Sequence, residues 1–305
     1  MLCVKADQKQ VEEIFRQVHC VWPHAEDPEE HLQKRLASTQ HKRAVWYAGI
    51  VENCVVCSLG AYPYELFGPD GKVKTARVFG AVFTPAAERG QGYASQLLRS
   101  VMQSYEAQGI YDFLLYSDIE PQFYEKLGFE SVPSYEWCLP VASGAVGEEN
   151  GRCSGVQRRS LPRPRRGDFS FGFHRSEESS RWLYEKQTGE VQCWVLTGLT
   201  VEGEEAYLLS TLDQGTYVLL ETNLSQESKD WPLFIDLIES DARRRGAHAA
   251  RGWWTAAELV PEISGSEILR RDKELLMWRS QGGPSDSWRI LRRECGFRAY
   301  LSEHV

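Results

Sequence analysis

Residues 78–95 read Val-Phe-Gly-Ala-Val-Phe-Thr-Pro-Ala-Ala-Glu-Arg-Gly-Gln-Gly-Tyr-Ala-Ser, the most informative stretch of the chain. The pattern predicts an apolar strand, a tight loop, and a helix with one apolar face. Gly90 and Gly92 leave backbone N–H groups uncovered where the helix dipole is positive, so the loop can bind a pyrophosphate. The spacing is neither G-x-x-x-x-G-K-[ST] nor G-x-G-x-x-G, which argues against a P-loop NTPase and a dinucleotide-binding fold.

The residues around this stretch alternate between helical and strand periods. The spacing of apolar side chains predicts helices over 8–19, 28–37 and 121–127. Strands are predicted over 43–50, 54–62, 75–83 and 111–116, with another from residue 129. This order is typical of an α/β sandwich of about 140 residues.

Two motifs in the first half resemble the GCN5-related N-acetyltransferases (GNAT). Arg89-Gly-Gln-Gly-Tyr-Ala94 matches the [QR]-x-x-G-x-[GA] acetyl-CoA signature of that superfamily. Phe123-Tyr-Glu-Lys-Leu-Gly-Phe129 resembles its F-Y-x-x-x-G-F element. The resemblance implies the GNAT acyl-CoA acyltransferase fold, a mixed, mostly antiparallel twisted sheet flanked by helices. Val-Phe-Thr-Pro at 82–85 looks most like the fungal lysine N-acetyltransferase branch, and the multi-domain bacterial enzymes that acetylate aminoglycosides and lysines are the runner-up.

The resemblance assigns a role to each motif position, with acetyl-CoA as cosubstrate. It implies that main-chain groups bind the pantetheine arm at Val82, Phe83 and Thr84. It implies that the loop binds the pyrophosphate at Arg89, Gly90, Gln91, Gly92, Tyr93, Ala94 and Ser95. Tyr124 falls on the tyrosine that protonates the departing CoA thiolate. The alternatives are a buried core aromatic at Tyr124 and a surface charge at Arg89.

The implied mechanism is direct attack of an amine on the thioester in a ternary complex. Because a lysine-type amine has a pKa of about 10.4, a base or a desolvating pocket must help. Asp118 and Glu120 follow the strand predicted at 111–116, so either could act through water, or both could be solvated capping carboxylates. Eis-like relatives use the terminal carboxylate, here Val305, which we favour less because the second half differs.

Composition limits the function classes. The chain has 305 residues, with 43 acidic and 35 basic side chains and a formal charge of −8, which argues against nucleic-acid binding. No membrane span or signal peptide is recognisable, so we expect a cytoplasmic protein. The eight cysteines are scattered, and Cys54 and Cys57 have no second ligand pair, so free thiols and no metal are expected.

The chain divides into three segments. Residues 1–140 form the predicted catalytic GNAT domain. Residues 141–168 are rich in Arg, Pro and Gly and read as a linker. Residues 169–305 form a second α/β domain. Within it, strand 216–221, helix 230–245 and strand 247–254 repeat the order around the glycine loop.

Aligning Gly109 with Gly246 shifts the numbering by 137, counted as 246 minus 109. Residues 226–232 then lie opposite the glycine loop. They contain no glycine, and Glu227 and Asp230 would repel a pyrophosphate. The second domain is therefore predicted to be a degenerate GNAT-like domain without a CoA loop.

The second half could form a wall of the substrate site. Its aromatic and acidic side chains suit a cationic amine, although a tryptophan-rich core with a solvated acidic helix is the plainer interpretation. The helix is expected over 268–278. The side chains concerned are Trp182, Trp194, Trp231, Trp253, Trp254, Trp278 and Trp288, with Glu258, Glu262, Glu267, Asp272 and Glu274.

The sequence thus predicts an acetyl-CoA-dependent N-acetyltransferase. Its acceptor would be a primary amine on a lysine-like molecule, an aminoglycoside or a polyamine, and neither the acceptor nor the oligomeric state is selected. The alternative function is a non-catalytic acyl-CoA-sensing or interaction module. The pairing of Tyr124 with a glycine loop favours the enzyme, since a sensor needs only the loop.

Overall fold

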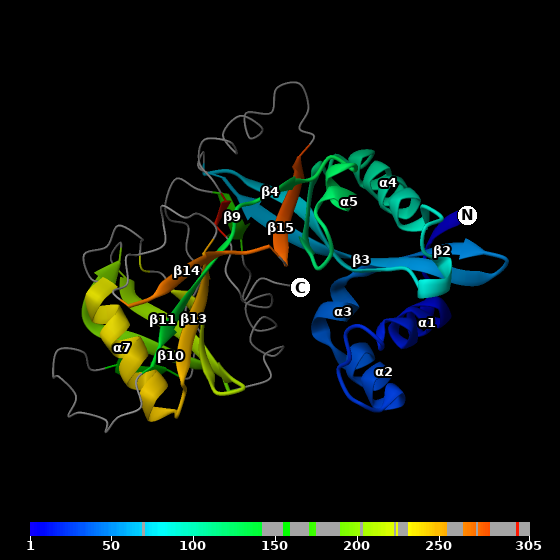
Figure 1. Cartoon of the computed structure of the whole chain (residues 1–305). Coiled ribbons are helices and arrows are strands. Elements are labelled where there is room, and N and C mark those ends of the chain that lie inside the picture. The colour runs from blue at the N-terminus through cyan, green and yellow to red at the C-terminus, as the bar shows by residue number, and fades with distance from the viewer. Residues whose placement is uncertain are drawn as a thin grey trace.

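The computed structural model describes residues 1–68, 71–141, 155–158, 171–174, 190–201, 204–222, 224, 231–254, 265–272, 274–280 and 297–298 (Figure 1). The first part comprises β1 (Leu2–Lys5), α1 (Gln8–Val18), α2 (Pro28–Ala37), α3 (Thr39–Arg43), β2 (Val45–Val51), β3 (Cys54–Phe67), β4 (Val73–Phe83), η1 (Ala86–Glu88), α4 (Tyr93–Glu106), β5 (Asp112–Ser117), α5 (Gln122–Glu125) and β6 (Glu130–Ser131). The remaining elements are β7 (Tyr135–Pro140), β8 (Gly155–Arg158), β9 (Phe171–His174), β10 (Gln192–Val201), β11 (Glu204–Asp213), β12 (Thr216–Thr222), α7 (Trp231–Arg244), β13 (Ala249–Trp254), β14 (Glu267–Arg270), β15 (Leu275–Ser280) and β16 (Phe297–Arg298).

The first sheet lies between two layers of helices. Its strand order is β1-β2-β3-β4-β5-β15-β6, and β4 and β5 are parallel with α4 as their crossover. Alternate residues of β5 face opposite sides, because Leu114 packs with α1 and α2 whereas Phe113 and Leu115 pack with α4. The α/β sandwich expected from the sequence is confirmed.

Capping residues define where the helices α1 and α2 begin. Asp7 caps α1 and exchanges hydrogen bonds with Gln10 in a capping box. Asp27 caps α2, and Pro28 occupies its first position. The buried face of α2 includes His31 and Arg35, which contact Phe15 of α1 and His41 of α3.

The second sheet repeats the first. Its order is β14-β7-β13-β12-β11-β10-β8, and β12 and β13 are parallel with α7 as their crossover. The ends of α4 and α7 match at the predicted shift of 137, because Ile110 N–H binds Tyr105 O and Ala247 N–H binds Ala242 O. Both closing glycines, Gly109 and Gly246, have positive φ. The two halves are therefore repeats of one α/β unit.

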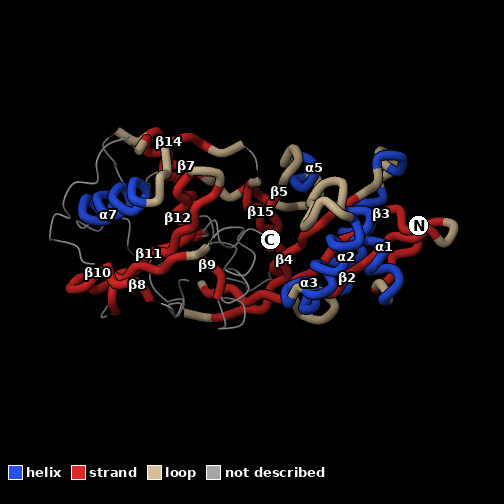
Figure 2. The backbone as a smooth tube through the Cα atoms, turned by 90° about the horizontal axis from the view of Figure 1, so that it is seen from below, coloured by secondary structure: helices blue, strands red, loops and turns tan. Residues whose placement is uncertain are grey.

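The two halves exchange strands, and β9 and β16 of the second half also belong to the first sheet, where β9 pairs with β3. β15 comes from the second half but lies between β5 and β6 in the first sheet. β7 comes from the first half but lies between β13 and β14 in the second sheet. Figure 2 shows the two lobes meeting where β15 runs beside β5. Each sheet therefore needs chain from both halves.

The exchanged strand β15 is held by buried polar contacts. Trp278 is fully buried and its Nε1 donates to Asp112 Oδ1 at 3.0 Å. Arg279 Nη1 lies 2.7 Å from Glu106 Oε1 at the end of α4. These bonds fix the register of β15 on β5.

The helix expected over 268–278 is wrong, because residues 268–270 belong to strand β14 and residues 275–278 to strand β15. Leu276, Met277 and Trp278 are buried on both faces of the sheet, so their apolar run has no alternation. A short run of this kind cannot be told from a buried helix by periodicity.

Cys54 and Cys57 lie on β3 as predicted, and the described cysteines are free thiols. No cluster of potential metal ligands occurs in the described part of the chain. None of the helices in that part is long and apolar enough to span a membrane.

Candidate functional site

The glycine loop forms an open cradle of backbone N–H groups. Gly90 and Gly92 have φ angles of 80° and 77°, and nothing lies within 4 Å of where a Cβ would stand. Gly92 is the N-cap of α4 and gives the first turn no side-chain cap. Arg89 Nε donates to Thr84 O at 3.1 Å and ties the loop to β4. The cradle thus fits an anion at the positive end of a 14-residue helix.

Strands β4 and β5 diverge beside this loop. Their pairing ends at Phe79 and Leu115, although β4 continues to Phe83 and β5 to Ser117. Ala81 has a φ of 49°, and the register with β3 shifts at the same place. The bulge leaves the last residues of β4 bordering a gap in the sheet.

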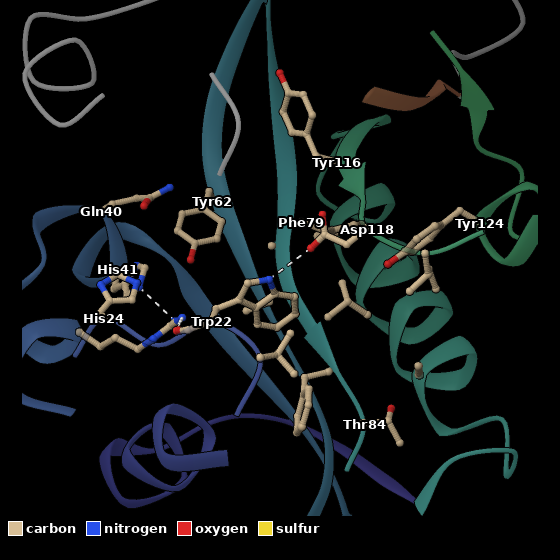
Figure 3. Close-up of a pocket in the computed structure, with 18 of the residues that line it drawn as sticks. Trp22, His24, Gln40, His41, Tyr62, Phe79, Thr84, Tyr116, Asp118 and Tyr124 are labelled. Carbon is tan, nitrogen blue, oxygen red and sulfur yellow. Dashed lines mark hydrogen bonds between the residues drawn. The ribbon is translucent and has the colours of Figure 1, made fainter. Parts of the chain in front are cut away.

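A cavity of about 1420 Å³ occupies this region. Of the residues predicted for the site, those lining it are Val82, Phe83, Thr84, Arg89, Gly90, Gly92, Tyr93, Ala94, Ser95, Asp118 and Tyr124. Gln91 and Glu120 are exposed and do not line it. Thr84 Oγ1 is buried and makes no hydrogen bond within the described part of the chain. The cavity therefore joins the glycine loop to Tyr124 (Figure 3).

Tyr124 is buried on the cavity wall and is held by aromatic neighbours. It is 5% exposed, and its ring meets Phe123 and Phe129 edge-on at centroid distances of 4.9 and 6.0 Å. Burial raises the pKa of Tyr124, and the nearby Asp118 charge raises it further. Its hydroxyl is therefore protonated at neutral pH and can donate a proton.

Asp118 stands between the two sides of the cavity. Its Oδ2 accepts a hydrogen bond of 3.2 Å from Trp22 Nε1, drawn dashed in Figure 3. Trp22 comes from the segment between α1 and α2, so this bond links the N-terminal helices to the end of β5. Sequence reasoning did not identify Trp22 as part of the site.

The second half contributes to the cavity wall, but through residues that the sequence did not suggest. They are Thr211, Asp213, Val218 and Arg251, from β11, β12 and β13. Asp213 Oδ2 lies 3.5 Å from Arg251 Nη2.

The tryptophans and acidic residues proposed for this wall do not line the cavity in the described part of the chain. Trp194 and Trp231 pack in the core of the second sheet, Trp278 in the first, and the Arg271 guanidinium lies 3.1 Å from the Trp253 ring centroid. Glu267 and Asp272 are exposed, and Glu274 pairs with Arg271. The rest (Trp182, Trp288, Glu258, Glu262, the Trp254 side chain), Val305 and most of the 141–168 linker lie outside the described residues.

A cluster of histidines and one arginine lies across the cavity from Tyr124. His24, His41, Gln40 and Tyr62 occupy that side in Figure 3. Arg35 is 3% exposed and its Nη2 donates to Trp22 O at 3.2 Å. Burial lowers the pKa of Arg35 to about 10 and that of His24 to about 4, the latter with help from the Arg35 charge.

His41 makes the fold sensitive to acid. Burial, and then the Arg35 charge, lower the pKa of His41 well below 6.5, whereas in the unfolded chain it is near 6.5. Its contribution to stability is therefore present above pH 6.5 and is lost as the pH falls. We expect the free energy of unfolding to drop below pH 6.5, with His41→Gln removing up to about 1.4 kcal/mol per pH unit from that slope. Urea titrations at pH 7, 6 and 5 measure it, and equal slopes for both proteins would contradict it.

The fold and the cavity define a class. An anion cradle at a helix start, a gap between diverging parallel strands and a buried tyrosine border one cavity of an α/β fold of the GNAT type. Residues 4–132 match the sequence family described as the acetyltransferase (GNAT) domain. Residues 4–132 are therefore assigned to the GNAT acetyltransferase superfamily.

Solved structures share the fold along most of the chain. A probable N-acyltransferase from Enterococcus faecalis V583 is 14% identical, with 92% of this chain and 72% of that one covered and a TM-score of 0.68. A GCN5-related N-acetyltransferase from Anabaena variabilis is 13% identical over 92% and 72%, with a TM-score of 0.66. Eis1 from Mycobacterium abscessus is 12% identical over 92% and 73%, with a TM-score of 0.60. None of the curated proteins matches the chain in sequence.

Proposed function

We propose that the protein is an acetyl-CoA-dependent N-acetyltransferase that acetylates a primary amine. The observation that carries the proposal is that the glycine loop and Tyr124 line the same cavity. A sensor of acyl-CoA would need the loop but not a buried, protonated phenol beyond it. The finer assignment to the fungal lysine branch remains a hypothesis within this proposal.

Two segments of the chain would bind different parts of CoA. N–H groups of residues 90–95 would hold the pyrophosphate of CoA. The last residues of β4, Val82 to Thr84, would hold the pantetheine arm through main-chain groups, since the gap beside β5 leaves them accessible. When bound, the cosubstrate supplies an acetyl thioester for the transfer.

The transfer would proceed in one ternary complex. The amine nitrogen attacks the thioester carbonyl, so a C–N bond forms and the C–S bond breaks. The proton lost by the amine passes through water to Asp118, and Tyr124 gives its proton to the departing thiolate and regains one from solvent. General acid catalysis of this kind is typically worth about 10²- to 10⁴-fold in rate.

Gly92→Val tests the binding part of the proposal. Valine is strained at the φ of 77°, and its branched side chain would cover the N–H cradle. We expect at least a tenfold weaker CoA affinity by calorimetry, and a matching rise in the acetyl-CoA KM when thiol release is followed with a panel of amines.

The matched control is Gly109→Val at the other end of the same helix. Gly109 has a φ of 81° and equally open surroundings, so the backbone strain is similar. This variant should lose stability but keep its affinity for CoA. If the two variants bound CoA equally, or if the unaltered protein released no thiol with any amine of the panel, the proposal would be wrong.

A further inference from the structure

The side of the cavity opposite Tyr124 holds a cation that no described carboxylate neutralises. Arg35 is 3% exposed, and none of the described acids forms an ion pair with it. Among the other charged groups that line the same cavity, Lys34 pairs with Glu30, Asp213 pairs with Arg251, and Asp118 accepts a hydrogen bond from Trp22. A buried charge without a counterion is costly, so a site of this kind suits an anionic ligand.

The hydrogen bond between Arg35 and His41 also indicates a site for an anion. Arg35 Nη1 lies 3.1 Å from His41 Nε2. Since arginine can only donate, His41 Nε2 must accept, and in the neutral ring the proton is then on Nδ1. His41 Nδ1 is buried and has no partner among the described residues. The atom is therefore a donor without an acceptor.

Two further donors near His41 are in the same situation. Arg35 Nε and Gln40 Nε2 are buried, and neither has a partner in the described part of the chain. Gln40 is 7% exposed and His41 is 9% exposed, so all three side chains are more than nine-tenths buried. The site therefore has three hydrogen-bond donors without acceptors, and one of them is cationic. The two oxygens of a carboxylate are acceptors of the kind that such donors bind.

We propose that the acceptor of this enzyme is an amine that carries a carboxylate, and that Arg35, Gln40 and His41 bind this carboxylate. The inference rests on the proposed function and narrows its substrate class from amines in general to amino-acid-type acceptors. Neighbouring side chains cover the three donor atoms, so the carboxylate displaces part of that cover as it binds. The amine then extends toward Asp118, which lies between this subsite and Tyr124 in Figure 3.

The test uses two acceptors that differ in one group. Nα-acetyl-lysine has a free carboxylate and one amine, and Nα-acetyl-lysine amide has a carboxamide instead. With the full chain and acetyl-CoA, we expect the acid to have a KM about tenfold or more below that of the amide. Equal KM values with measurable acetyl transfer would overturn the subsite and leave the proposed function intact.

Variants assign the effect to Arg35. Arg35→Met should raise the KM of the acid to that of the amide, and Arg35→Lys should restore part of the preference. The control Lys42→Met removes an exposed cation of α3 that does not line the cavity, and it should change the KM of neither substrate.

A binding measurement covers the case of no turnover. The acid should raise the melting temperature of the CoA-bound protein more than the amide does, and Arg35→Met should abolish the difference. An equal shift with both compounds would overturn the inference whether or not acetyl transfer occurs. If Arg35→Met does not fold, Arg35→Lys and Gln40→Leu are compared with the two acceptors in its place.

Discussion

Tyr124→Phe is expected to lower kcat about 10²- to 10⁴-fold while CoA still binds. The ring stays, so the edge-on packing against Phe123 and Phe129 is kept, and only the proton donor is removed. Stopped-flow or steady-state thiol release measures the rate, and calorimetry with CoA measures the binding. The loss should appear in kcat rather than in the KM for acetyl-CoA, because the phenol acts on the departing sulfur.

Tyr105→Phe is the matched control for this loss. Tyr105 is also buried, at 3% exposed, but it lies on α4 and outside the cavity. Its replacement removes a phenol hydroxyl from the same domain and should leave the rate within about twofold. Unchanged acetylation by Tyr124→Phe would remove Tyr124 from the proposed role.

The sequence predicted the elements of the first half well, because their signals are local. The helix predicted over 28–37 is α2 (Pro28–Ala37), since both its proline start and its acid-rich first turn lie within the segment. The repeat of the strand-helix-strand unit in the second half was also visible, at the shift that the closing bonds of α4 and α7 share.

The exchange of strands was not predictable in this way. Which strand pairs with β5 depends on contacts between residues 112–117 and 275–280, far apart in the sequence. The apolar run at Leu275–Trp278 gives no sign of its partner and was interpreted as helix. The pattern of apolar side chains shows that a segment is buried. In a strand that is buried on both faces it does not show which strand is the neighbour.

Part of the candidate site could likewise be predicted from the sequence, and part could not. The glycine loop and Tyr124 belong to short motifs, and the structure brings them to one cavity. The residues across the cavity from Tyr124, which are Arg35, Gln40, His41 and Tyr62, come from α2, α3 and β3 and do not form a sequence motif. The one usable signal was Arg35 at helical spacing from His31 on the buried face of α2, where a charged side chain is unusual.

Trp278→Ala is expected to destabilise the first sheet, although Trp278 belongs to the second half of the chain. The side chain is fully buried, so its truncation should cost about 3–5 kcal/mol and also removes the bond to Asp112 Oδ1. Because β15 supplies the neighbour of β5, amide protection should fall in Asp112–Ser117 as well as in β15 itself. Urea unfolding measures the energy, and hydrogen exchange measures where protection is lost.

The control for Trp278→Ala is Ile268→Ala on β14. This side chain is 42% exposed, so its truncation should change the free energy of unfolding by no more than about 0.5 kcal/mol. If Trp278→Ala left the protection of β5 unaltered, the two sheets would unfold independently and the shared strands would not couple them. A fall in both β5 and β15 would mean that the first sheet, which carries the glycine loop and Tyr124, depends on a strand about 160 residues further along the chain, because β15 pairs with β5. The second half would then be needed for the site to form, whether or not it touches the acceptor.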